Sequence, residues 1–439
     1  MAAQAPVSDK PRHNVPPRLM ETTPVVLGLE EQVELDEVED PEALRDDILR
    51  HVAGLDLPRG QADEGSPKET IRASHAHQRA SVFRRESELV GSKAGRLLDR
   101  FAVGVEVEPQ LISPRLVPVV AGSDDSDLFR LATLLWSVPV SHGYGRRMRY
   151  LVMDDYNDKL IGLFALGDPV FNLRARDAWL GWNVEQRRER LVNLMDAFIL
   201  GAVPPYSFLL GGKLVASMIG SSEVAEAFEA KYGASTGIIS GRTKHARLGL
   251  VTVTSALGRS SIYNRLVLRE DAADSKSPVL VRLDRIGETS GFGHFQLSDE
   301  LFARIKKILR QTNHPYVSGN RFGQGPNWRI RVIRVGLEKL GLDQDLLRHG
   351  IAREIYVMPI ASNAKEYLVG TDMSLTMDRP SASVIAEAAL NRWVVPRAKR
   401  DSRYRDFTRK DLLALVSGVE TTDAPLRTAV ASGFGDELS

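Results

Sequence analysis

Two apolar runs joined by a short polar turn place the strongest constraint on how this chain can fold. Residues 149–154 and 159–165 are rich in strand-forming types, so they predict an antiparallel hairpin. A helix is predicted at 184–198, and a strand at 248–254 leads into a short helix at 259–266. Strands and helices that interleave behind a hairpin predict an α+β (mixed α/β) fold, with one central sheet flanked by helices.

The composition along the chain predicts four segments. Residues 1–66 form a disordered arm that ends in an acidic helix at 41–52, where Asp and Pro provide an N-cap and a first turn. Residues 67–128 are predicted to be a helical N-terminal region. Residues 129–270 form the α+β core, and residues 271–439 form a basic C-terminal region.

The absence of cysteine limits the chemistry that the chain can perform. Among 439 residues there is no cysteine, which excludes disulfides, cysteine-ligated zinc and a thiol nucleophile. The first residues lack the features of a secretory signal, and no apolar run is long enough to span a membrane. We therefore expect a cytoplasmic protein with no membrane partner.

Charge is unevenly distributed, although the formal net charge is only +1. Residues 30–47 contain ten acidic residues and one basic residue, whereas residues 301–335 contain eight Lys or Arg and no carboxylate. Residues 392–410 contain eight basic and two acidic residues. Local patches of this kind predict an anionic partner better than the total charge does.

The first candidate anion site follows a strand predicted at 205–210. Gly211, Gly212 and Lys213 would bring free backbone amides and an ammonium group together at the start of a helix. The segment is not a Walker A loop, because Ser207 and Leu214 stand where that loop needs Gly and Ser or Thr. A tight packing turn with the lysine on the surface is the alternative.

The second candidate anion site is the segment that follows the strand at 248–254. It offers hydroxyls, amides and two guanidinium groups to a phosphate or carboxylate, and Ser260 and Tyr263 are candidate catalytic residues within it. The alternative is that the serine caps a helix and the tyrosine packs in the core. The predicted anion-binding residues here are Arg259, Ser260, Ser261, Asn264 and Arg265.

Carboxylates at strand ends and in loops provide a further set of catalytic candidates. Asp168 and Asp177 are the main ones, and with Asp196 they could converge on Mg²⁺ for phosphodiester chemistry. The alternatives are that Asp168 opens a turn and that Asp177 forms an ion pair. His75 and His77 have no evident third ligand, so no metal site is predicted and solvent-exposed histidines are expected. Which cofactor, if any, the chain binds is left unknown by the residues, and an acyl-transfer alternative would hold an anionic cofactor at Lys213, Arg259 and Ser260.

The basic C-terminal region contains the strongest candidate for nucleic-acid binding. Guanidinium and ammonium groups lie on a predicted helix at 298–311 and in the segment after it, and aromatic side chains are interspersed with them. The alternative is a solvated helical face with a buried tryptophan. The predicted nucleic-acid-binding residues are Lys306, Lys307, Arg310, Arg321, Phe322, Trp328, Arg329, Arg331 and Arg334.

Several unusual strings between about residues 68 and 360 resemble the Druantia anti-phage defence protein A family. The resemblance implies a bacterial defence component that is encoded beside a large helicase-like protein and other subunits. It carries over no catalytic residues. The strings are Trp136-Ser-Val-Pro139, Gly143–Arg149, Leu160-Ile-Gly162, Gly167-Asp-Pro169, Arg176–Trp182, Gly201–Tyr206, Leu210–Lys213 and Ser255–Arg265.

A fainter similarity is to GNAT-type N-acetyltransferases. It implies a GNAT-like central sheet in which Tyr263 occupies the position of a tyrosine that can act as a general acid. The pyrophosphate loop of that family is not clearly present, because residues 209–213 are shorter and differently spaced. A GNAT-like fold without acetyl transfer is therefore the better interpretation.

These observations predict an anti-phage defence component that binds nucleic acid, expected to be DNA, and works with a helicase-like partner and other defence subunits. Alternatives are a GNAT-like enzyme that transfers an acyl or similar group, and a metal-dependent nuclease. The acidic segment at residues 30–47 is expected to dock on a basic surface, either its own or a partner's, where it could cover a nucleic-acid site.

Overall fold

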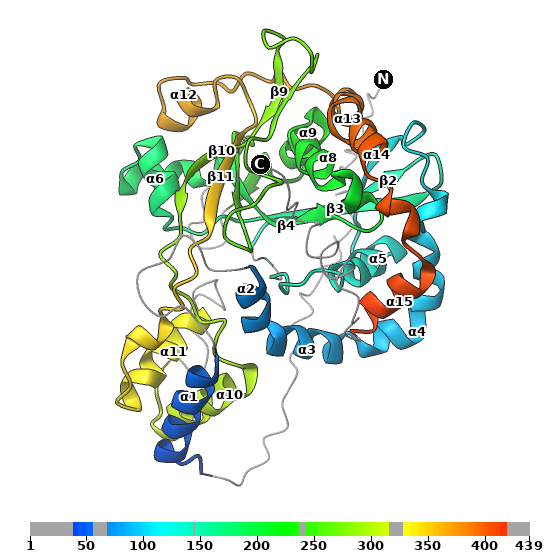
Figure 1. Cartoon of the computed structure of the whole chain (residues 1–439). Coiled ribbons are helices and arrows are strands. Elements are labelled where there is room, and N and C mark those ends of the chain that lie inside the picture. Colours follow the sequence, from blue (N-terminus) through cyan, green and yellow to red (C-terminus); the bar gives the residue numbers. More distant parts are fainter. Residues whose placement is uncertain are drawn as a thin grey trace, which may run out of the picture. The chain divides into compact units, whose positions relative to one another are not determined.

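The fold is α+β and is built on a mixed seven-stranded sheet (Figure 1). The computed structural model describes residues 38–55, 68–141, 143, 145–236, 243–315 and 328–418. The strand order is β1-β2-β3-β4-β7-β11-β10, and all neighbours are antiparallel except β4 and β7. These strands are β1 (Pro114–Pro118), β2 (Arg147–Asp154), β3 (Lys159–Gly167), β4 (Leu194–Ala202), β7 (Leu250–Thr254), β10 (Asp284–Glu288) and β11 (Glu354–Pro359).

Two small two-stranded sheets and a set of mostly short helices complete the described part of the chain. The small sheets pair β5 (Ala234–Thr236) with β6 (Thr243–His245), and β8 (Val267–Arg269) with β9 (Val279–Arg282). The helices are α1 (Pro41–Gly54), α2 (Lys68–Ser74), α3 (Ala76–Arg85), α4 (Ser87–Leu97), α5 (Asp124–Thr133), α6 (Arg174–Leu180), α7 (Val184–Arg190), α8 (Gly211–Met218), α9 (Ser222–Tyr232), α10 (Asp299–Gln311), α11 (Trp328–Lys339), α12 (Ala364–Val369), α13 (Ala382–Ala389), α14 (Val395–Arg400) and α15 (Arg409–Val416).

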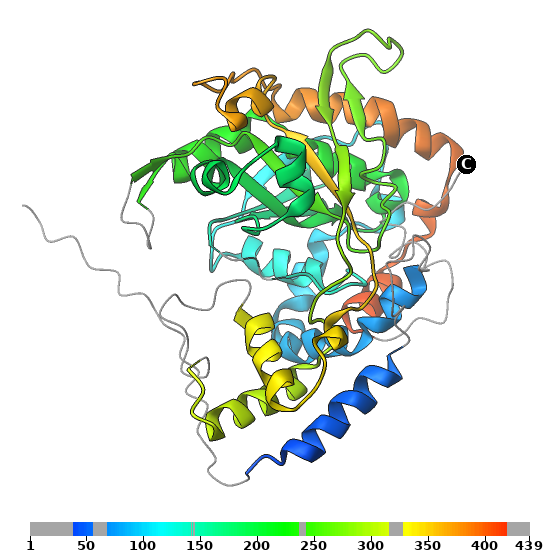
Figure 2. The ribbon, with the colours of Figure 1, turned by 90° about the vertical axis from the view of Figure 1, so that its left-hand side faces the viewer.

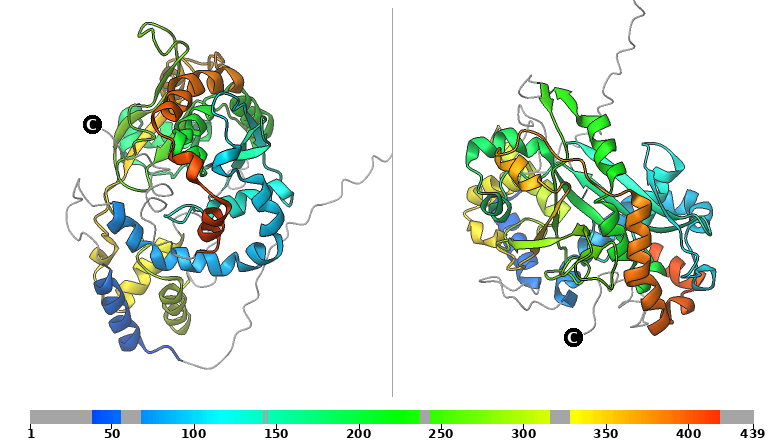
Figure 3. Two further views of the ribbon diagram at one scale, coloured as in Figure 1. Left: turned by 45° about the vertical axis from the view of Figure 1, so that its right-hand side comes forward. Right: turned by 90° about the horizontal axis from the view of Figure 1, so that it is seen from above.

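Each face of the sheet is covered by its own helices, because side chains alternate along every strand. On one face Tyr150 and Val152 of β2 join a core with residues of α8, α9 and α13. Figure 3 shows α13 beside α8 on this face. On the other face Leu151 and Met153 join a core with residues of α4, α5 and α15. The sheet is therefore buried on both sides, which explains its continuous apolar runs.

A third core lies among α1, α10 and α11 (Figure 2). The acidic helix α1 buries Leu44, Ile48 and Val52 against apolar residues of the two later helices. Asp40 caps α1, since its carboxylate accepts a hydrogen bond from the Glu42 amide at 3.0 Å. The predicted amphipathic helix is thus present, and its apolar stripe packs on helices more than 240 residues away in the sequence.

The fold class, the hairpin and several helices confirm the sequence predictions, but three segments differ. The predicted helix at 184–198 ends at Arg190, and Leu194 begins β4, because this apolar run is buried between β3 and β7. A short apolar run does not distinguish a buried strand from a helix. Residues 206–209 form a 3₁₀ turn instead of a strand, and residues 261–265 form turns instead of a helix.

In the described part of the chain no helix is both long and apolar enough to cross a membrane.

Candidate functional site

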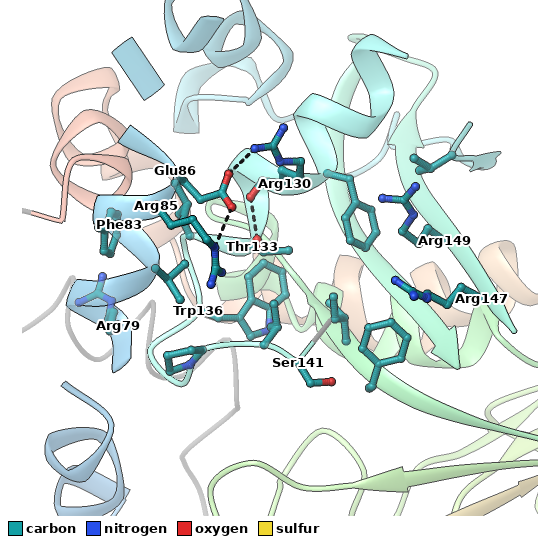
Figure 4. Close-up of a pocket in the computed structure, with 18 of the residues that line it drawn as sticks. Arg79, Phe83, Arg85, Glu86, Arg130, Thr133, Trp136, Ser141, Arg147 and Arg149 are labelled. Atoms are coloured by element: carbon teal, nitrogen blue, oxygen red, sulfur yellow. Dashed lines mark hydrogen bonds and ion pairs between the residues drawn. The ribbon is translucent and has the colours of Figure 1, made fainter. Parts of the chain in front are cut away.

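A positively charged pocket lies between the sheet and the helices α3 and α5, and its volume is about 480 Å³. Among its described lining residues are six cationic side chains and one carboxylate, so it favours an anionic ligand. Figure 4 shows arginines of β2 on one side, arginines of α3 on the other, and Trp136 between them. The charged lining residues are Arg79, Arg85, Arg130, Arg147, Arg149, Lys231 and Glu86.

Strand geometry places two of the arginines in the pocket. Arg147 and Arg149 are two positions apart on β2, so they extend from the same face of the sheet as Leu151. Next to Leu151 that face is closed by α5, whereas next to the arginines it remains open as the pocket. The two guanidinium groups therefore enter the pocket from a rigid strand.

Arg149 is the lining residue that most favours an anionic ligand. It is half-buried, and among the described residues its guanidinium group makes no hydrogen bond or ion pair. It lies over the Phe129 ring with 5.8 Å to the centroid. Burial lowers the pKa of Arg149, and the neighbouring Arg147 lowers it further. An anion bound in the pocket would relieve both effects.

The carboxylate in the pocket is already engaged. Glu86 accepts a hydrogen bond from Arg130 at 2.6 Å and lies 3.6 Å from the Arg85 side chain. Its side chain is 12% exposed, so it neutralises part of the α3 and α5 side. The β2 side of the pocket carries Arg147 and Arg149, and among the described lining residues it adds no carboxylate.

Aromatic side chains form the floor and one wall of the pocket, and two glycines make room for them. Trp136 and Phe129 are buried, whereas Phe198 is only partly buried. A Cβ atom at Gly201 would lie 2.8 Å from the Trp136 ring. A Cβ atom at Gly143, whose φ is +60°, would lie 2.6 Å from the Phe198 ring. Both rings are therefore held close against backbone.

Gly201→Ala is expected to destabilise the protein by about 1–3 kcal/mol, because the new methyl group overlaps the buried Trp136 ring. Urea denaturation measures the change, and tryptophan fluorescence reports displacement of the ring. The matched control is Gly91→Ala in α4, where a Cβ atom meets nothing within 4 Å. The control should be stabilising by about 0.5–1 kcal/mol, and equal effects of the two variants would contradict this packing.

The structure brings the two predicted anion segments together at Lys213. Its ammonium group donates to the Ile262 carbonyl at 3.1 Å and lies 5.6 Å from the Trp393 ring centroid. Burial lowers the pKa of Lys213 to about 8, and Arg392 adds to the effect. A Cβ atom at Gly211 would lie 2.6 Å from the Tyr206 carbonyl oxygen, so this glycine is explained by close packing.

The remaining residues of the second segment divide between surface and core. Arg259 and Arg265 are exposed, and Asn264 is half-buried. Ser260 is buried, and its hydroxyl has no hydrogen-bond partner among the described residues. The hydroxyl of Ser261 also has no partner among those residues. Gly212, from the first segment, is buried in α8. Tyr263 is buried against Tyr356 with ring centroids 5.6 Å apart, and burial raises the pKa of its hydroxyl.

Two of the candidate carboxylates form ion pairs that hold loops in place. Asp168 accepts from the Arg146 guanidinium at 2.6 Å, at the start of β2. Asp177 accepts from Arg176 at 2.6 Å and from Arg187 at 2.7 Å. Asp168 and Asp177 therefore hold neighbouring segments in place, and Asp168 helps to hold β2 beside the pocket.

Asp196 is engaged differently, because it accepts a hydrogen bond from the Thr252 hydroxyl at 2.5 Å across the parallel pair β4 and β7. Burial raises the pKa of Asp196 to about 6. Within the described ranges, no three or more His, Cys, Asp or Glu side chains form a group that could hold a metal ion.

The expectation of solvent-exposed histidines at 75 and 77 is wrong for the first of them. His75 is only 3% exposed, because the loop around Phe295 covers it with the rings 4.2 Å apart. His77 is half-buried and meets His51 of α1 edge to face at 5.6 Å. These contacts are between segments distant in sequence, which the local pattern could not reveal.

The basic helices α10 and α11 are partly neutralised by carboxylates from outside the acid-free run. Arg304 pairs at 2.7 Å with both Glu39 and Asp47 of the acidic segment. Arg329 pairs with Asp299 at 2.5 Å. The acidic segment thus docks on a basic helix of its own chain.

The other residues predicted to bind nucleic acid lie on or near α10 and α11, or outside the residues that the structure describes. Lys306 lies 5.6 Å from the Phe302 ring centroid, Trp328 meets the same ring edge to face, and Arg334 donates to Gln344 at 2.9 Å. Within the described part of the chain no ion pair forms at Lys307, Arg310 or Arg331, which are exposed. Arg321 and Phe322 lie outside the described residues.

The sequence predictions did not include the pocket, although two signals for it are present in the sequence. Arg147 and Arg149 are charges with a two-residue spacing at the start of an otherwise apolar strand. Trp136, Pro139 and Arg149 also belong to the strings that carry the family resemblance. The remaining lining residues come from distant segments, so only the fold brings them together.

Comparison with known proteins identifies the family. The profile of the family "Druantia protein DruA" matches residues 66–370. The chain is 44% identical over 379 residues to the Druantia protein DruA of Escherichia coli (strain UMEA 4076-1). The alignment covers 85% of this chain and 92% of the relative. No solved structure matches the chain, so the GNAT-like interpretation of the sheet stays a prediction. The chain therefore belongs to the DruA family of Druantia anti-phage defence proteins.

Proposed function

We propose that this anti-phage defence component binds nucleic acid, with DNA as the expected ligand, through the arginine-lined pocket. The observation that carries the proposal is Arg149, a half-buried cation that faces a cavity and has no anionic partner among the described residues. Arg147 beside it and the aromatic lining fit a ligand that combines phosphates with flat rings. A purely apolar or cationic ligand would leave these groups unsatisfied.

We propose the basic helices α10 and α11 as a second set of phosphate contacts. Lys307, Arg310 and Arg331 are exposed and well suited to contacting phosphates without reading sequence. The family resemblance adds the proposal that the protein works in the cytoplasm with a helicase-like partner and other defence subunits, to which it passes the bound strand.

The test is a salt titration of binding to single-stranded DNA, duplex DNA and RNA. Arg147→Ala with Arg149→Ala is expected to weaken binding roughly tenfold or more, because two charge-assisted contacts are lost. The slope of log K against log salt should become shallower by about 1.4 for a single strand. Fluorescence anisotropy with labelled strands measures both quantities.

The matched control is Arg188→Ala with Lys399→Ala, which removes two exposed positive charges outside the pocket. It should change affinity about threefold at most, since only the overall charge of the protein changes. Equal losses in the two double variants would contradict binding in the pocket. No binding to any nucleic acid at low salt would contradict the proposed function itself.

A further inference from the structure

We infer that the pocket holds a single unpaired nucleotide unit, with its phosphate at the rim and its base against the aromatic floor. The inference rests on the proposed function, and it names the form of nucleic acid that this site accepts. Its first support is the order of side chains from the rim inward. The cations Arg85, Arg130, Arg147 and Lys231 are exposed, whereas Trp136 and Phe129 beneath them are buried.

This order matches the two halves of a nucleotide. A phosphate at the rim would meet Arg147 and Lys231, which are already linked because the lysine donates to the Arg147 carbonyl at 2.9 Å. A base further inside would meet the partly buried Phe198 and the half-buried Arg149. Arginine donates to the acceptor atoms of bases and also stacks on them, so it suits the inner position.

The aromatic lining argues against a duplex as the ligand of the pocket. In a duplex the bases are stacked and paired, so a protein reaches their flat faces only after a base has left the helix. Phosphates of a duplex could contact the exposed cations at the rim, but the rings of Trp136 and Phe198 would then have no function in binding. Stacking on aromatic side chains is the usual means by which proteins hold unpaired bases.

The size of the pocket indicates one nucleotide unit instead of a run of bases. A volume of about 480 Å³ lies within the range of sites that enclose one small molecule. The walls at Trp136 and Phe198 are fixed by contacts with Gly201 and Gly143, so the space does not widen without backbone movement. The same chemistry is offered by a strand end, an extruded base and a free nucleotide.

The experiment compares four ligands by fluorescence anisotropy and calorimetry: a strand of about twelve nucleotides, its blunt duplex, the same duplex with a single-stranded overhang, and free nucleoside monophosphates. Single strand and overhang should bind more tightly than blunt duplex. Quenching of Trp136 fluorescence should accompany binding and disappear in Trp136→Phe. If free monophosphates compete as well as strands of equal nucleotide concentration, the natural source is a free nucleotide; if they compete weakly, it is a strand.

The variant that isolates stacking is Phe198→Leu, which keeps apolar bulk and removes the flat ring. It should weaken single-strand binding about fivefold to one-hundredfold and leave the salt slope unchanged. The matched control is Phe171→Leu, because Phe171 is 40% exposed and lies outside the pocket beneath an arginine, Arg187, at 4.6 Å. Thermal denaturation of both variants confirms that they are folded.

Two results would overturn the inference. Blunt duplex that binds as tightly as the single strand, or a Phe198→Leu variant that behaves like Phe171→Leu, would show that the rings do not contact a base. If Arg147→Ala with Arg149→Ala still weakens binding in that case, the proposed function stands and only the unpaired nucleotide is rejected. Loss of all nucleic-acid binding in the wild type would instead reject the proposed function.

Discussion

Lowering the pH from about 7 to about 5 is expected to reduce the free energy of unfolding by about 4 kcal/mol through two buried histidines, His75 and His349. Burial lowers the pKa of His75 to about 4 and that of His349 to about 3, and the nearby Arg353 lowers both further. In the unfolded chain each would titrate near its ordinary value of 6.5. The unfolded state therefore gains protons in this range, and the folded state does not.

Hydrogen bonds in the structure require both histidines to be neutral. The Arg353 guanidinium can only donate, so Nε2 of His75, 3.2 Å away, must accept. Nδ1 of His75 then carries the proton and donates to the Gln78 side-chain oxygen at 2.7 Å. Nδ1 of His349 accepts from the Ile351 amide at 3.1 Å. Protonation of either acceptor nitrogen would break its hydrogen bond.

The pKa values set the sign and the range of the effect. Because both folded pKa values lie below the unfolded value, the contribution of these two histidines to stability is constant above about pH 7 and falls as the pH drops through 6.5 toward the folded values of about 4 and 3. Urea denaturation at a series of pH values measures it. His349→Asn, whose side-chain oxygen can still accept from the Ile351 amide, should remove the contribution of His349, about 2 kcal/mol of the fall. The exposed His245→Asn is the control, and a stability that does not change between pH 7 and 5 would contradict the argument.

Arg176→Ala is expected to lower the free energy of unfolding by about 3–5 kcal/mol. The Arg176 side chain is fully buried, and it donates to the carbonyls of Val170 and Phe171 at 2.8 Å as well as to Asp177. Removal of the guanidinium group leaves the Val170 and Phe171 carbonyls without this donor, and among the described residues Asp177 keeps its contact with Arg187. Each group left unsatisfied carries a desolvation cost.

Urea denaturation of Arg176→Ala beside Arg174→Ala tests this prediction. Arg174 lies on the same helix, is exposed, and within the described residues has no ion pair, so its replacement should change stability by no more than about 0.5 kcal/mol. Arg176→Lys keeps the charge but cannot reach both carbonyls and the carboxylate, so an intermediate loss is expected. A loss below about 1 kcal/mol for Arg176→Ala would mean that water replaces the guanidinium group.

Local patterns predicted the elements whose signal is contained in neighbouring residues. The hairpin of β2 and β3 follows from alternation and a polar turn, and α1 follows from its cap and its apolar spacing. The strand β4 was missed because both its faces are buried, so its sequence lacks the alternation that distinguishes a strand. Its identity depends on its neighbours in the sheet, which the local sequence does not specify.

The candidate site was harder to predict than the fold, because residues from several segments form it. Composition alone favoured the basic run after residue 300, but Arg304 and Arg329 in that run are paired with carboxylates from other segments. In contrast Arg149 lies in an ordinary apolar strand and is half-buried in a pocket. Whether a charge is available to a ligand depends on its neighbours in space, and sequence counts do not contain that information.

The packing of α1 against α10, in the core shared with α11, decides how the protein can be divided into fragments. A fragment that starts at about residue 68 would lack Leu44, Ile48 and Val52 of α1, which are buried in the core shared with α10 and α11. Removing the acidic segment to test its effect on nucleic-acid binding would thus also weaken the helices that carry the basic residues. Neutralising Glu39 and Asp47 in the full-length chain changes the charge and keeps that apolar interface closed.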